Sequence, residues 1–561
     1  MSHVADDRLP LQRAYHWESK SPGVIFLSQP MGGGVVKDYT WAQAMDEARR
    51  MATHLKAQGF EPGTHIALMS KNSAHWIIAD LAIWMAGHVS VPLYPTLAAE
   101  TVRQILEHSE SKLLFIGKLD DWEMMKDGVP TGLPAITLPL SPKTSFPTWA
   151  DIVAKTAPMT GNPVRAADEL ATIIYTSGTT GLPKGVMHSF DSMAWSIDAI
   201  LQRVSLGPSD RLMSYLPLSH VAERLVVEMG ALATGARVYF TESLETFAAD
   251  LRYARPTLFF SVPRLWVRFQ QGVHKQMPPE KLSRLLMIPI VGRIVAKKIL
   301  TGLGLDQCRY ASGGAAPMPP ELLRWYKKLG LEVLEGYGMT ENFALSHGNT
   351  PGSSRPGYVG VAYPGVETRI DPASGEVQMR SPGLMMGYYK APDLTLAAMT
   401  EDGWLRTGDK GEVDAEGRLR ITGRVKDLFK TSKGKYVAPG PIEDKLVIHP
   451  AVEACCVAGA NFGQPFGLIM LAPDAAAGAA KDPAVRAQLT ASLKAHLDKI
   501  NATLDPHEQM DFIAVVGEPW SVENGFLTPT FKIKRNRIED VYGRQFEAWA
   551  REKKPVVWQA A

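Results

Sequence analysis

Residues 175–186 read Tyr-Thr-Ser-Gly-Thr-Thr-Gly-Leu-Pro-Lys-Gly-Val and follow an apolar, strand-like run at 169–175. Three glycines remove Cβ obstruction from the loop, so several backbone N–H groups can converge on one anion. Its hydroxyls add further donors and Lys184 adds a positive charge. The stretch therefore predicts a polyphosphate-binding loop in a nucleotide-binding enzyme, against the alternative of an ordinary polar surface loop. The binding residues predicted here are Thr176, Ser177, Gly178, Thr179, Thr180, Gly181 and Lys184.

This loop differs from the phosphate loop of kinases and ATPases of the Walker A type. That motif places Gly-Lys-Ser/Thr after four spacer residues, whereas here Pro183 precedes Lys184 and Gly185 follows it. The chain also lacks the catalytic and metal-binding motifs of protein kinases. Both of these enzyme classes are therefore excluded.

Length and composition predict a protein of two or more domains. A chain of 561 residues exceeds what one core organises, and 45% apolar residues suffice to fill several cores. With 60 basic and 58 acidic residues the net charge is +2, which gives no electrostatic case for nucleic acid as a partner. Cys308, Cys455 and Cys456 form neither a zinc motif nor a disulfide framework, which fits a reducing compartment.

The sequence predicts a cytoplasmic protein without a membrane-spanning helix. Residues 1–20 contain no apolar signal core, and no apolar run reaches the roughly 18 residues needed to cross a bilayer. Residues 285–300 are apolar, with Arg293, Lys297 and Lys298 in their second half, although Pro289 and Gly292 interrupt the helical pattern. Two interpretations stay open for this segment: contact with the inner, anionic membrane surface, or a buried helix with solvated lysines.

The order of predicted elements indicates an α/β fold. Helix-like segments such as 41–58 alternate with β-rich runs at 64–70 and 112–116, which predicts layered sheets that are partly parallel. Similar runs, each expected to precede a helix, lie at 169–175, 211–216, 237–240 and 257–262.

The chain changes character past residue 367. Strands at 376–380, 411–413 and 419–423 predict a β-rich subdomain with a hairpin. From 425 the pattern returns to mixed α/β, with an alanine-rich surface loop expected at 475–480 before a helix at 484–500. We thus expect a large N-terminal domain, 1–424, and a small mobile α/β C-terminal domain, 425–561.

Several further segments carry groups suited to a nucleotide. Residues 312–317 form a glycine turn that suits contact with a flat base, and 335–341 place an aromatic ring, a hydroxyl and a carboxylate around two glycines. Such a segment suits a base, a phosphate oxygen and Mg²⁺. Asp409 is suited to a ribose diol, with Arg424 available for the same sugar, and residues 528–535 supply a cationic cluster whose alternative is a solvated basic strand.

Taken together in this order, these motifs resemble the adenylate-forming superfamily of acyl-CoA synthetases, luciferases and peptide-synthetase adenylation domains. The runs Leu-Pro-Leu-Ser-His-Val-Ala-Glu-Arg at 216–224 and Leu-Thr-Pro-Thr-Phe-Lys at 527–532, and the segments 255–257 and 262–264, look like those of long-chain fatty acid-CoA ligases. The resemblance implies an enzyme that acts on a fatty acid, with ATP and coenzyme A as further substrates and Mg²⁺ as cofactor. The same resemblance implies a reaction in two steps: formation of acyl-AMP with release of pyrophosphate, and then formation of the thioester with release of AMP.

The resemblance also implies roles for individual residues. Catalytic roles fall to Lys532, His220, Thr340 and Glu341, with Thr176 and Glu341 as metal ligands. Nucleotide and coenzyme A contacts fall to Gly313, Gly314, Ala315, Glu335, Gly336, Tyr337, Gly338, Asp409, Arg424, Lys426, Lys433 and Gly434. Lys426 lies at the interdomain hinge position, and Lys433 with Gly434 would face the pantetheine channel, where a plain turn is an equal interpretation of the glycine.

Two questions stay open at the level of sequence. Strand alternation puts Lys532 and Lys534 on one face, so spacing alone does not choose the adenylating lysine, although the resemblance favours Lys532. The acyl acceptor is also open: an acyl-AMP ligase serving a separate carrier protein, or a CoA ligase for an aryl or medium-chain acid, fits the same motifs. About thirty residues follow Lys532, too few for a fused carrier domain of ordinary size.

Overall fold

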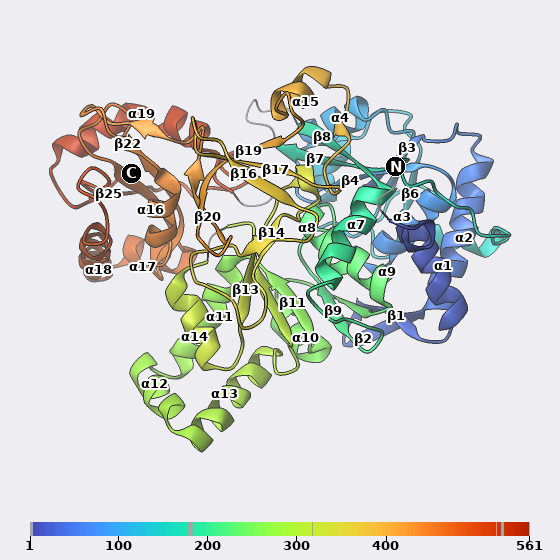
Figure 1. Ribbon diagram of the computed structural model, residues 1–561, viewed down its shortest axis with the longest axis horizontal. Helices are drawn as coiled ribbons and strands as arrows, with labels where there is room; N and C mark the ends of the chain where they lie inside the picture. The colour runs from blue at the N-terminus through green and yellow to red at the C-terminus, as the bar shows by residue number, and fades with distance from the viewer. Residues whose placement is uncertain (1–3, 178–182, 317, 523, 529–531, 560–561) are drawn as a thin grey trace.

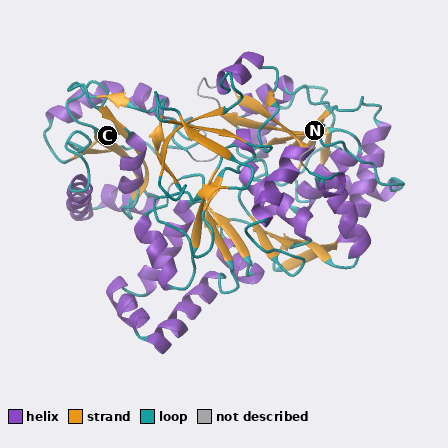
Figure 2. Cartoon of the chain, in the orientation of Figure 1, coloured by secondary structure: helices purple, strands orange, loops and turns teal. Residues whose placement is uncertain are grey.

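The computed structural model describes residues 4–177, 183–316, 318–522, 524–528 and 532–559. These residues form five sheets flanked by helices (Figures 1 and 2). Sheets of nine, seven and four strands come first, and sheets of two and four strands belong to the C-terminal part. The α/β fold class predicted from the sequence is confirmed. Fold alone does not fix the boundary at 424/425, which stays a prediction.

The first sheet has nine strands. In spatial order they are β15 (Val361–Ala362), β14 (His347–Gly348), β13 (Val333–Tyr337), β12 (Tyr310–Gly313), β11 (Leu258–Ser261), β9 (Arg211–Ser214), β10 (Arg237–Phe240), β1 (Ile25–Gly32) and β2 (Val35–Thr40). Its central strands, from β13 to β1, are parallel, and the outer pairs are antiparallel. The carboxyl ends of β12 and β13 therefore meet at one edge of the sheet.

The second sheet has seven strands and carries the glycine-rich hairpin. Its order is β18 (Gly387–Tyr388), β8 (Pro183–Ser189), β7 (Leu170–Ser177), β4 (Val89–Leu93), β3 (His65–Met69), β5 (Leu113–Ile116) and β6 (Ala135–Thr137). The prediction that a helix follows the strand near 169–175 is wrong, because β8 folds back antiparallel on β7 before the next helix begins.

Helices fill the space around these two sheets. They are α1 (Pro10–Lys20), α2 (Trp41–Ala57), α3 (Ala74–Met85), α4 (Ala99–His108), α5 (Trp122–Met125), α6 (Trp149–Lys155), α7 (Phe190–Leu201), α8 (Val221–Glu223), α9 (Gly230–Thr234), α10 (Phe247–Ala254), α11 (Pro263–Gln276), α12 (Pro279–Met287), α13 (Pro289–Leu303) and α14 (Pro320–Lys328). Every residue of α3 is buried, as expected of a helix that is apolar on all sides. Helix α2 begins with a capping box in which Thr40 and Gln43 bond each other's backbone N–H.

The third sheet is the predicted β-rich subdomain. It comprises β16 (Glu367–Ile370), β17 (Glu376–Arg380), β19 (Leu405–Val413) and β20 (Leu419–Arg424), all antiparallel, with α15 (Pro392–Ala398) inserted before β19. The predicted hairpin is confirmed by the β19–β20 pair, whose register places Asp409 opposite Arg424.

The remaining chain forms a smaller α/β unit. A two-stranded ribbon of β21 (Phe429–Lys430) and β22 (Tyr436–Val437) leads to a sheet of β23 (Val452–Ala458), β24 (Phe466–Leu471), β25 (Ile513–Val515) and β26 (Val556–Trp558). Its helices are α16 (Pro439–Leu446), α17 (Pro473–Lys481), α18 (Pro483–Asn501) and α19 (Arg535–Arg551). The prediction of a surface loop at 475–480 is wrong. These residues lie inside α17, because alanine favours helix and Pro473 occupies the first helical position.

Candidate nucleotide and acyl-activation site

The glycine-rich stretch forms the end of the β7–β8 hairpin. Thr176 pairs with Lys184 and Ser177 with Pro183, so both strands extend further into the stretch than the sequence predicts. Gly178, Thr179, Thr180 and Gly181 lie outside the described residues. Gly185 lies within β8, where a Cβ would meet the Ile173 side chain at 2.7 Å, so packing between the strands requires this glycine.

Strand β18 connects this hairpin to Glu341. Tyr388 pairs with Val186 of β8, and its hydroxyl donates a 2.8 Å hydrogen bond to Glu341 Oε1. The ammonium of Lys184 lies 5.4 Å from the centre of the same ring, within reach of a cation–π interaction. Tyr388 is 9% exposed, and burial, with the Glu341 carboxylate as the second cause, raises the pKa of its hydroxyl. The hydroxyl therefore stays protonated and remains a donor.

A second connection from β8 reaches the residue before Glu341. The buried His188 side chain donates from Nε2 to the carbonyl oxygen of Thr340 at 2.7 Å. Burial lowers the pKa of this imidazole to about 4, so the ring is neutral at physiological pH and Nε2 carries the hydrogen. Sequence reasoning missed His188 and Tyr388, because each lies far along the chain from the turn that it contacts.

The predicted base-binding segments meet at the carboxyl ends of two parallel strands. Gly313 of β12 pairs with Glu335 of β13. The chain continues from β12 into Gly314 and Ala315, while Gly336 and Tyr337 are the last residues of β13 and Gly338 follows them. Ala315 has a left-handed φ of 66°, which bends the chain sharply after β12. The structure thus brings together both segments that the sequence assigns to a base.

Glu335 is a buried carboxyl group with spare acceptor capacity. Its Oε1 accepts the Met318 N–H at 3.3 Å, while Oε2 has no partner among the described residues. Burial raises the pKa of this carboxyl to about 7. A ligand with an N–H donor would satisfy the unpaired oxygen.

Asp409 joins three elements of the site. It accepts hydrogen bonds from the Tyr337 hydroxyl at 2.7 Å and from Arg424 Nε at 2.8 Å. Burial, followed by the Asp409 charge, raises the pKa of Tyr337, so its hydroxyl remains a donor. The residues that the resemblance assigns to adenine and ribose therefore form one contiguous group.

His220 caps the short helix α8. Its Nδ1 accepts the N–H of Ala222 at 3.2 Å, which leaves the hydrogen of the neutral ring on Nε2. Burial, with the positive charge of Lys532 as the second cause, lowers the pKa of His220 to about 4. The ring is thus an uncharged donor that lies within electrostatic reach of Lys532.

Two buried residues after His220 anchor this segment. Glu223 accepts the Tyr215 N–H at 2.9 Å, and burial raises the pKa of its carboxyl to about 8. Arg224 donates to Thr172 of β7 at 2.6 Å and pairs with the buried carboxylates Asp80 and Glu228. The motif at 216–224 is therefore held rigidly between the two large sheets.

Lys532 reaches the same region from the small C-terminal unit. Burial of the ammonium is the main cause that lowers its pKa, and Arg424 lowers it further, while Asp409 and Glu341 oppose the shift. The residue as a whole is exposed, and its N–H bonds Thr528 Oγ1 at 3.0 Å. Lys534 instead precedes α19, where its N–H bonds the Phe526 carbonyl. Lys532 is therefore within electrostatic reach of Asp409 and Glu341, and its assignment as the adenylating lysine over Lys534 stays a prediction.

Three predicted contact residues lie elsewhere in this arrangement. Lys426 is exposed in the turn between β20 and β21. Lys433 Nζ bonds Gln464 Oε1 at 3.1 Å within the small unit, and Gly434 is exposed with a φ of 78°, as its turn requires. Gly434 lies in a turn and Lys433 bonds within the small unit, and the pantetheine-channel role of both residues stays a prediction.

The donor set fits Mg²⁺ held largely by phosphate and water. Among the described residues no cluster of three or more His, Cys, Asp or Glu forms a cage for a metal. Mg²⁺ typically takes one or two carboxylates, substrate phosphates and several waters. Glu341, whose Oε1 accepts the Tyr388 hydroxyl, would supply one such carboxylate, and Thr176 would supply a hydroxyl at the hairpin.

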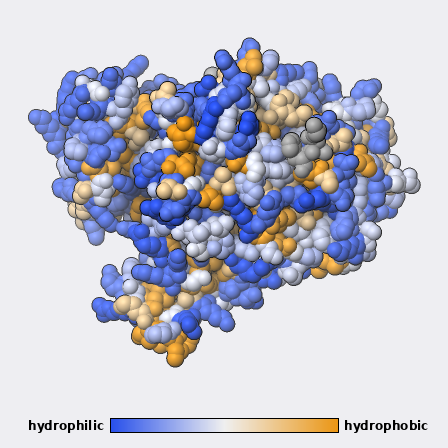
Figure 3. Space-filling model, viewed as in Figure 1, coloured by the Kyte–Doolittle hydropathy of each residue, from blue (hydrophilic) through white to orange (hydrophobic). Residues whose placement is uncertain are grey.

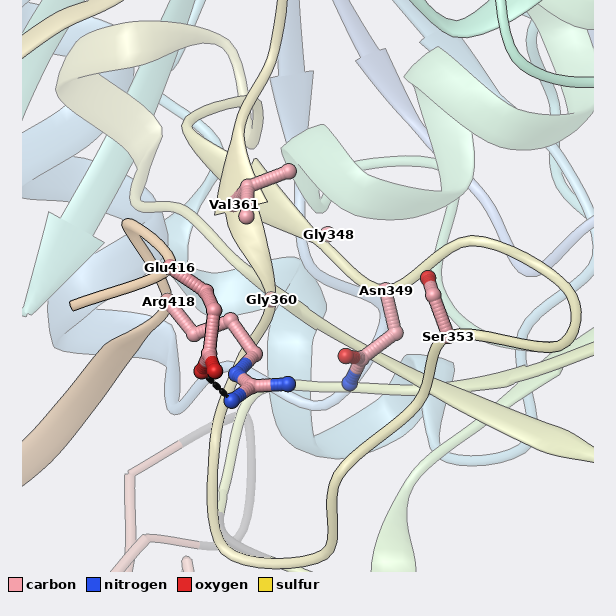
Figure 4. Close-up of a pocket in the computed structure, with 7 residues that line it drawn as sticks. All are labelled: Gly348, Asn349, Ser353, Gly360, Val361, Glu416 and Arg418. Carbon is pink, nitrogen blue, oxygen red and sulfur yellow. Dashed lines mark hydrogen bonds and ion pairs between the residues drawn. The ribbon is translucent and has the colours of Figure 1, made fainter. Parts of the chain in front are cut away.

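A hollow of about 170 Å³ adjoins this group, since its lining residue Gly348 pairs with Gly336 and the Asn349 N–H bonds the Glu335 carbonyl. Its lining includes Gly348, Asn349, Val361 and the ion pair between Glu416 and Arg418 (Figure 4). None of the predicted site residues lines it.

Comparisons with known proteins identify the family and the fold. The family model described as AMP-binding enzyme matches residues 15–389. Long-chain-fatty-acid–CoA ligase FadD15 of Mycobacterium bovis is 30% identical, covering 95% of this chain and 96% of the relative. The peroxisomal long chain acyl-CoA synthetase 6 of Arabidopsis thaliana is 30% identical, covering 91% and 81%. The anthranilate CoA ligase AuaEII, solved with anthranoyl-AMP, shares the fold, with a TM-score of 0.77 at 20% identity over 96% of this chain and 98% of that one.

Proposed function

The chain belongs to the AMP-binding enzyme family, and from this premise we propose that it is an ATP-dependent fatty acid-CoA ligase. One observation carries the proposal: Lys532 lies within electrostatic reach of Asp409, Glu341 and His220, three groups that come from three other parts of the chain. The identity to long-chain ligases supports a fatty acid as the substrate class.

In the first step a carboxylate oxygen of the fatty acid bonds the α-phosphorus of ATP. The bond between the α-phosphorus and its bridging oxygen to the β-phosphate breaks, and pyrophosphate leaves. Lys532 would bridge the attacking carboxylate and the α-phosphate, and Thr340 would donate to the same phosphate. Thr176 to Lys184 would hold the β- and γ-phosphates, and His220 would border the acid as an uncharged donor. This is catalysis by positioning and charge neutralisation.

Mg²⁺ would be held by Glu341 and Thr176 and would supply charge neutralisation at the phosphates. In the second step the coenzyme A sulfur, as the thiolate, bonds the acyl carbon, and the bond from that carbon to the phosphate oxygen breaks to release AMP. Lys433 and Gly434 would approach the thiol arm only after the C-terminal unit turns about Lys426. That movement is part of the proposal, since both residues lie away from Asp409 in the present arrangement.

A panel of carboxylic acids tests the proposed substrate class. Purified protein is incubated with ATP, Mg²⁺ and coenzyme A, and AMP production is measured for short, medium, long and aryl acids. We expect a maximum on long-chain fatty acids. A maximum on aryl or medium-chain acids, or acyl transfer only to a phosphopantetheinylated carrier protein, would overturn the fatty-acyl assignment in favour of those alternatives.

The contact between Tyr388 and Glu341 gives a prediction of its own. We expect Tyr388→Phe to raise the Mg²⁺ concentration needed for half-maximal activity by roughly tenfold, because it removes a hydrogen bond that orients a carboxylate. The ring, and hence its contact with Lys184, is retained. The measurement is a Mg²⁺ titration of pyrophosphate exchange, alongside the Mg²⁺ dependence of thermal stabilisation by ATP.

Tyr389→Phe is the matched control for this change. Its hydroxyl bonds the surface carboxylate of Glu110 at 3.1 Å, away from Glu341. We expect this variant to keep the Mg²⁺ requirement of the unaltered protein. An unchanged requirement in Tyr388→Phe would remove the positioning role of that hydroxyl.

The cellular setting is also a proposal. Within the described ranges, no helix is both long and apolar enough to span a bilayer. The described cysteines are unpaired, which supports the reducing cytoplasm as the compartment. We propose that the enzyme works there and contacts the inner membrane surface peripherally.

A further inference from the structure

The helix pair α12 and α13 extends from the body of the protein and ends in an apolar tip (Figures 1 and 3). We define this tip by its exposed side chains: Met287 (73% exposed), Ile288 (49%), Ile290 (75%), Val291 (38%) and Ile294 (64%). Five large apolar residues within an eight-residue stretch form an exposed apolar patch, and such patches typically mark a surface that binds a partner or a membrane. The alternative of a buried helix is therefore wrong for this face of α13.

The tip is a built part of the fold. Leu282 and Ala296 are buried on the inner sides of the two helices. Gly292 allows close packing, since a Cβ there would lie 2.7 Å from the Leu286 carbonyl oxygen. Pro289 opens α13 at its first turn, so it separates the two helices and does not disrupt either of them. The exposed apolar residues are thus held in place by ordered packing.

Charge identifies the partner. All basic side chains between residues 279 and 303 are exposed: Lys281, Arg284, Arg293, Lys297 and Lys298. Glu280 is the single acidic residue in this segment. An apolar tip bordered by cations matches an anionic bilayer, whose headgroups attract lysine and arginine while its acyl boundary accepts aliphatic side chains.

We propose that the tip of α12 and α13 inserts into the boundary region of an anionic lipid surface, with the flanking cations contacting the headgroups. The inference deepens the proposed function and rests on it for its purpose, because a long-chain fatty acid resides in the membrane that the tip would contact. The binding itself follows from exposure and charge, independently of any reaction. Its test therefore measures binding and not turnover.

Vesicle co-sedimentation tests the proposal with the full chain. We expect binding to phosphatidylcholine vesicles that contain phosphatidylglycerol, little binding to pure phosphatidylcholine, and weakening by salt. Ile290→Asp/Ile294→Asp, one helical turn apart on the tip, should reduce binding at least tenfold. Lys297→Gln/Lys298→Gln should reduce it by roughly fivefold for each charge removed.

A matched control changes two exposed apolar residues elsewhere. Val164 and Leu244 are 65% and 85% exposed, and Val164→Asp/Leu244→Asp should bind vesicles as the unaltered protein does. Thermal melting shows that each variant is folded, and sedimentation velocity gives its oligomeric state. Equal vesicle binding by the tip variant overturns the proposal, as does the absence of binding by the unaltered protein. A dimer that only the tip substitutions dissociate, without vesicle binding, would assign the tip to contact between copies and overturn it too.

Failure here is distinguishable from failure of the proposed function. If the carboxylate panel shows no acid-dependent AMP release while vesicles bind, the reaction assignment fails and the lipid surface stands. If acids are activated and vesicles do not bind, the lipid-surface proposal fails and the reaction assignment stands.

Discussion

Lys532→Ala is expected to lower fatty acid-dependent pyrophosphate exchange into ATP by roughly 100- to 1,000-fold, the cost typical of removing one donor that stabilises transition-state charge. The amine lies near Asp409, Glu341 and His220, so its loss removes the cation that would bridge carboxylate and α-phosphate. Conversion of supplied acyl-AMP to the thioester should stay within about threefold, because the bond to phosphate has already formed. The two half-reactions, assayed separately, give the measurement.

Lys534→Ala is the control for this substitution. Lys534 is exposed and lies at the start of α19, so we expect both half-reactions to survive its loss. Equal loss of both half-reactions in Lys532→Ala, or adenylation lost in Lys534→Ala instead, would contradict the assignment.

The pH dependence of adenylation gives a second test of the same amine. Burial lowers the pKa of Lys532 below the usual 10.5 of lysine, and the reactive form is the ammonium, which exists below that pKa. Exchange activity should therefore decline as the pH rises, and the midpoint of this decline should lie below the pKa of an ordinary lysine. Lys532→Arg, which stays charged, should lose this alkaline decline even where its activity is reduced.

Fixing the C-terminal unit in its present position should stop the second half-reaction and spare the first. Arg264 and Arg268 of α11 pair with Glu453 of β23, and Arg268 Nη2 lies 3.3 Å from Glu453 Oε1. Cysteines in Arg268→Cys/Glu453→Cys, joined by a cleavable bismaleimide, would hold this contact. We expect thioester formation to fall at least 100-fold, since misplacing a reacting group costs that much, while pyrophosphate exchange is retained.

Reduction of the linker is the internal control, because it should restore thioester formation. The native Cys455 and Cys456 are buried and Cys308 is only partly exposed, so the introduced thiols are the accessible pair. The single variant Glu453→Cys, treated with the same reagent, controls for modification. Full turnover by the crosslinked protein would refute the rotation of the C-terminal unit.

Local chemistry explains which features the sequence could predict. The β19–β20 hairpin, the strand at 170–177 and the helix beginning at Trp41 follow from alternation, turn residues and a capping box, all of which act over a few residues. The meeting of Gly313 with Glu335 follows from the rule that parallel strands bring their carboxyl ends to one edge.

Features set by tertiary contacts could not be predicted. Nothing near Tyr388 or His188 in the chain signals their bonds to Glu341 and to the Thr340 carbonyl, because strand pairing with distant segments creates both contacts. Spacing likewise left Lys532 and Lys534 equivalent, because the surroundings of each lysine depend on how the C-terminal unit packs against distant residues. The alanine-rich stretch in α17 is a different case. Its helix propensity is a local property, so a helix could have been predicted there in place of a surface loop.

Isotope exchange between labelled pyrophosphate and ATP tests the central claim most directly, because it reports mixed-anhydride formation without any acyl acceptor. With purified protein and Mg²⁺, label should enter ATP when a long-chain fatty acid is present and remain at background without the acid. Exchange that ignores the acid, or none with any carboxylate tried, would contradict activation of an organic acid at the site around Asp409, Glu341 and Lys532.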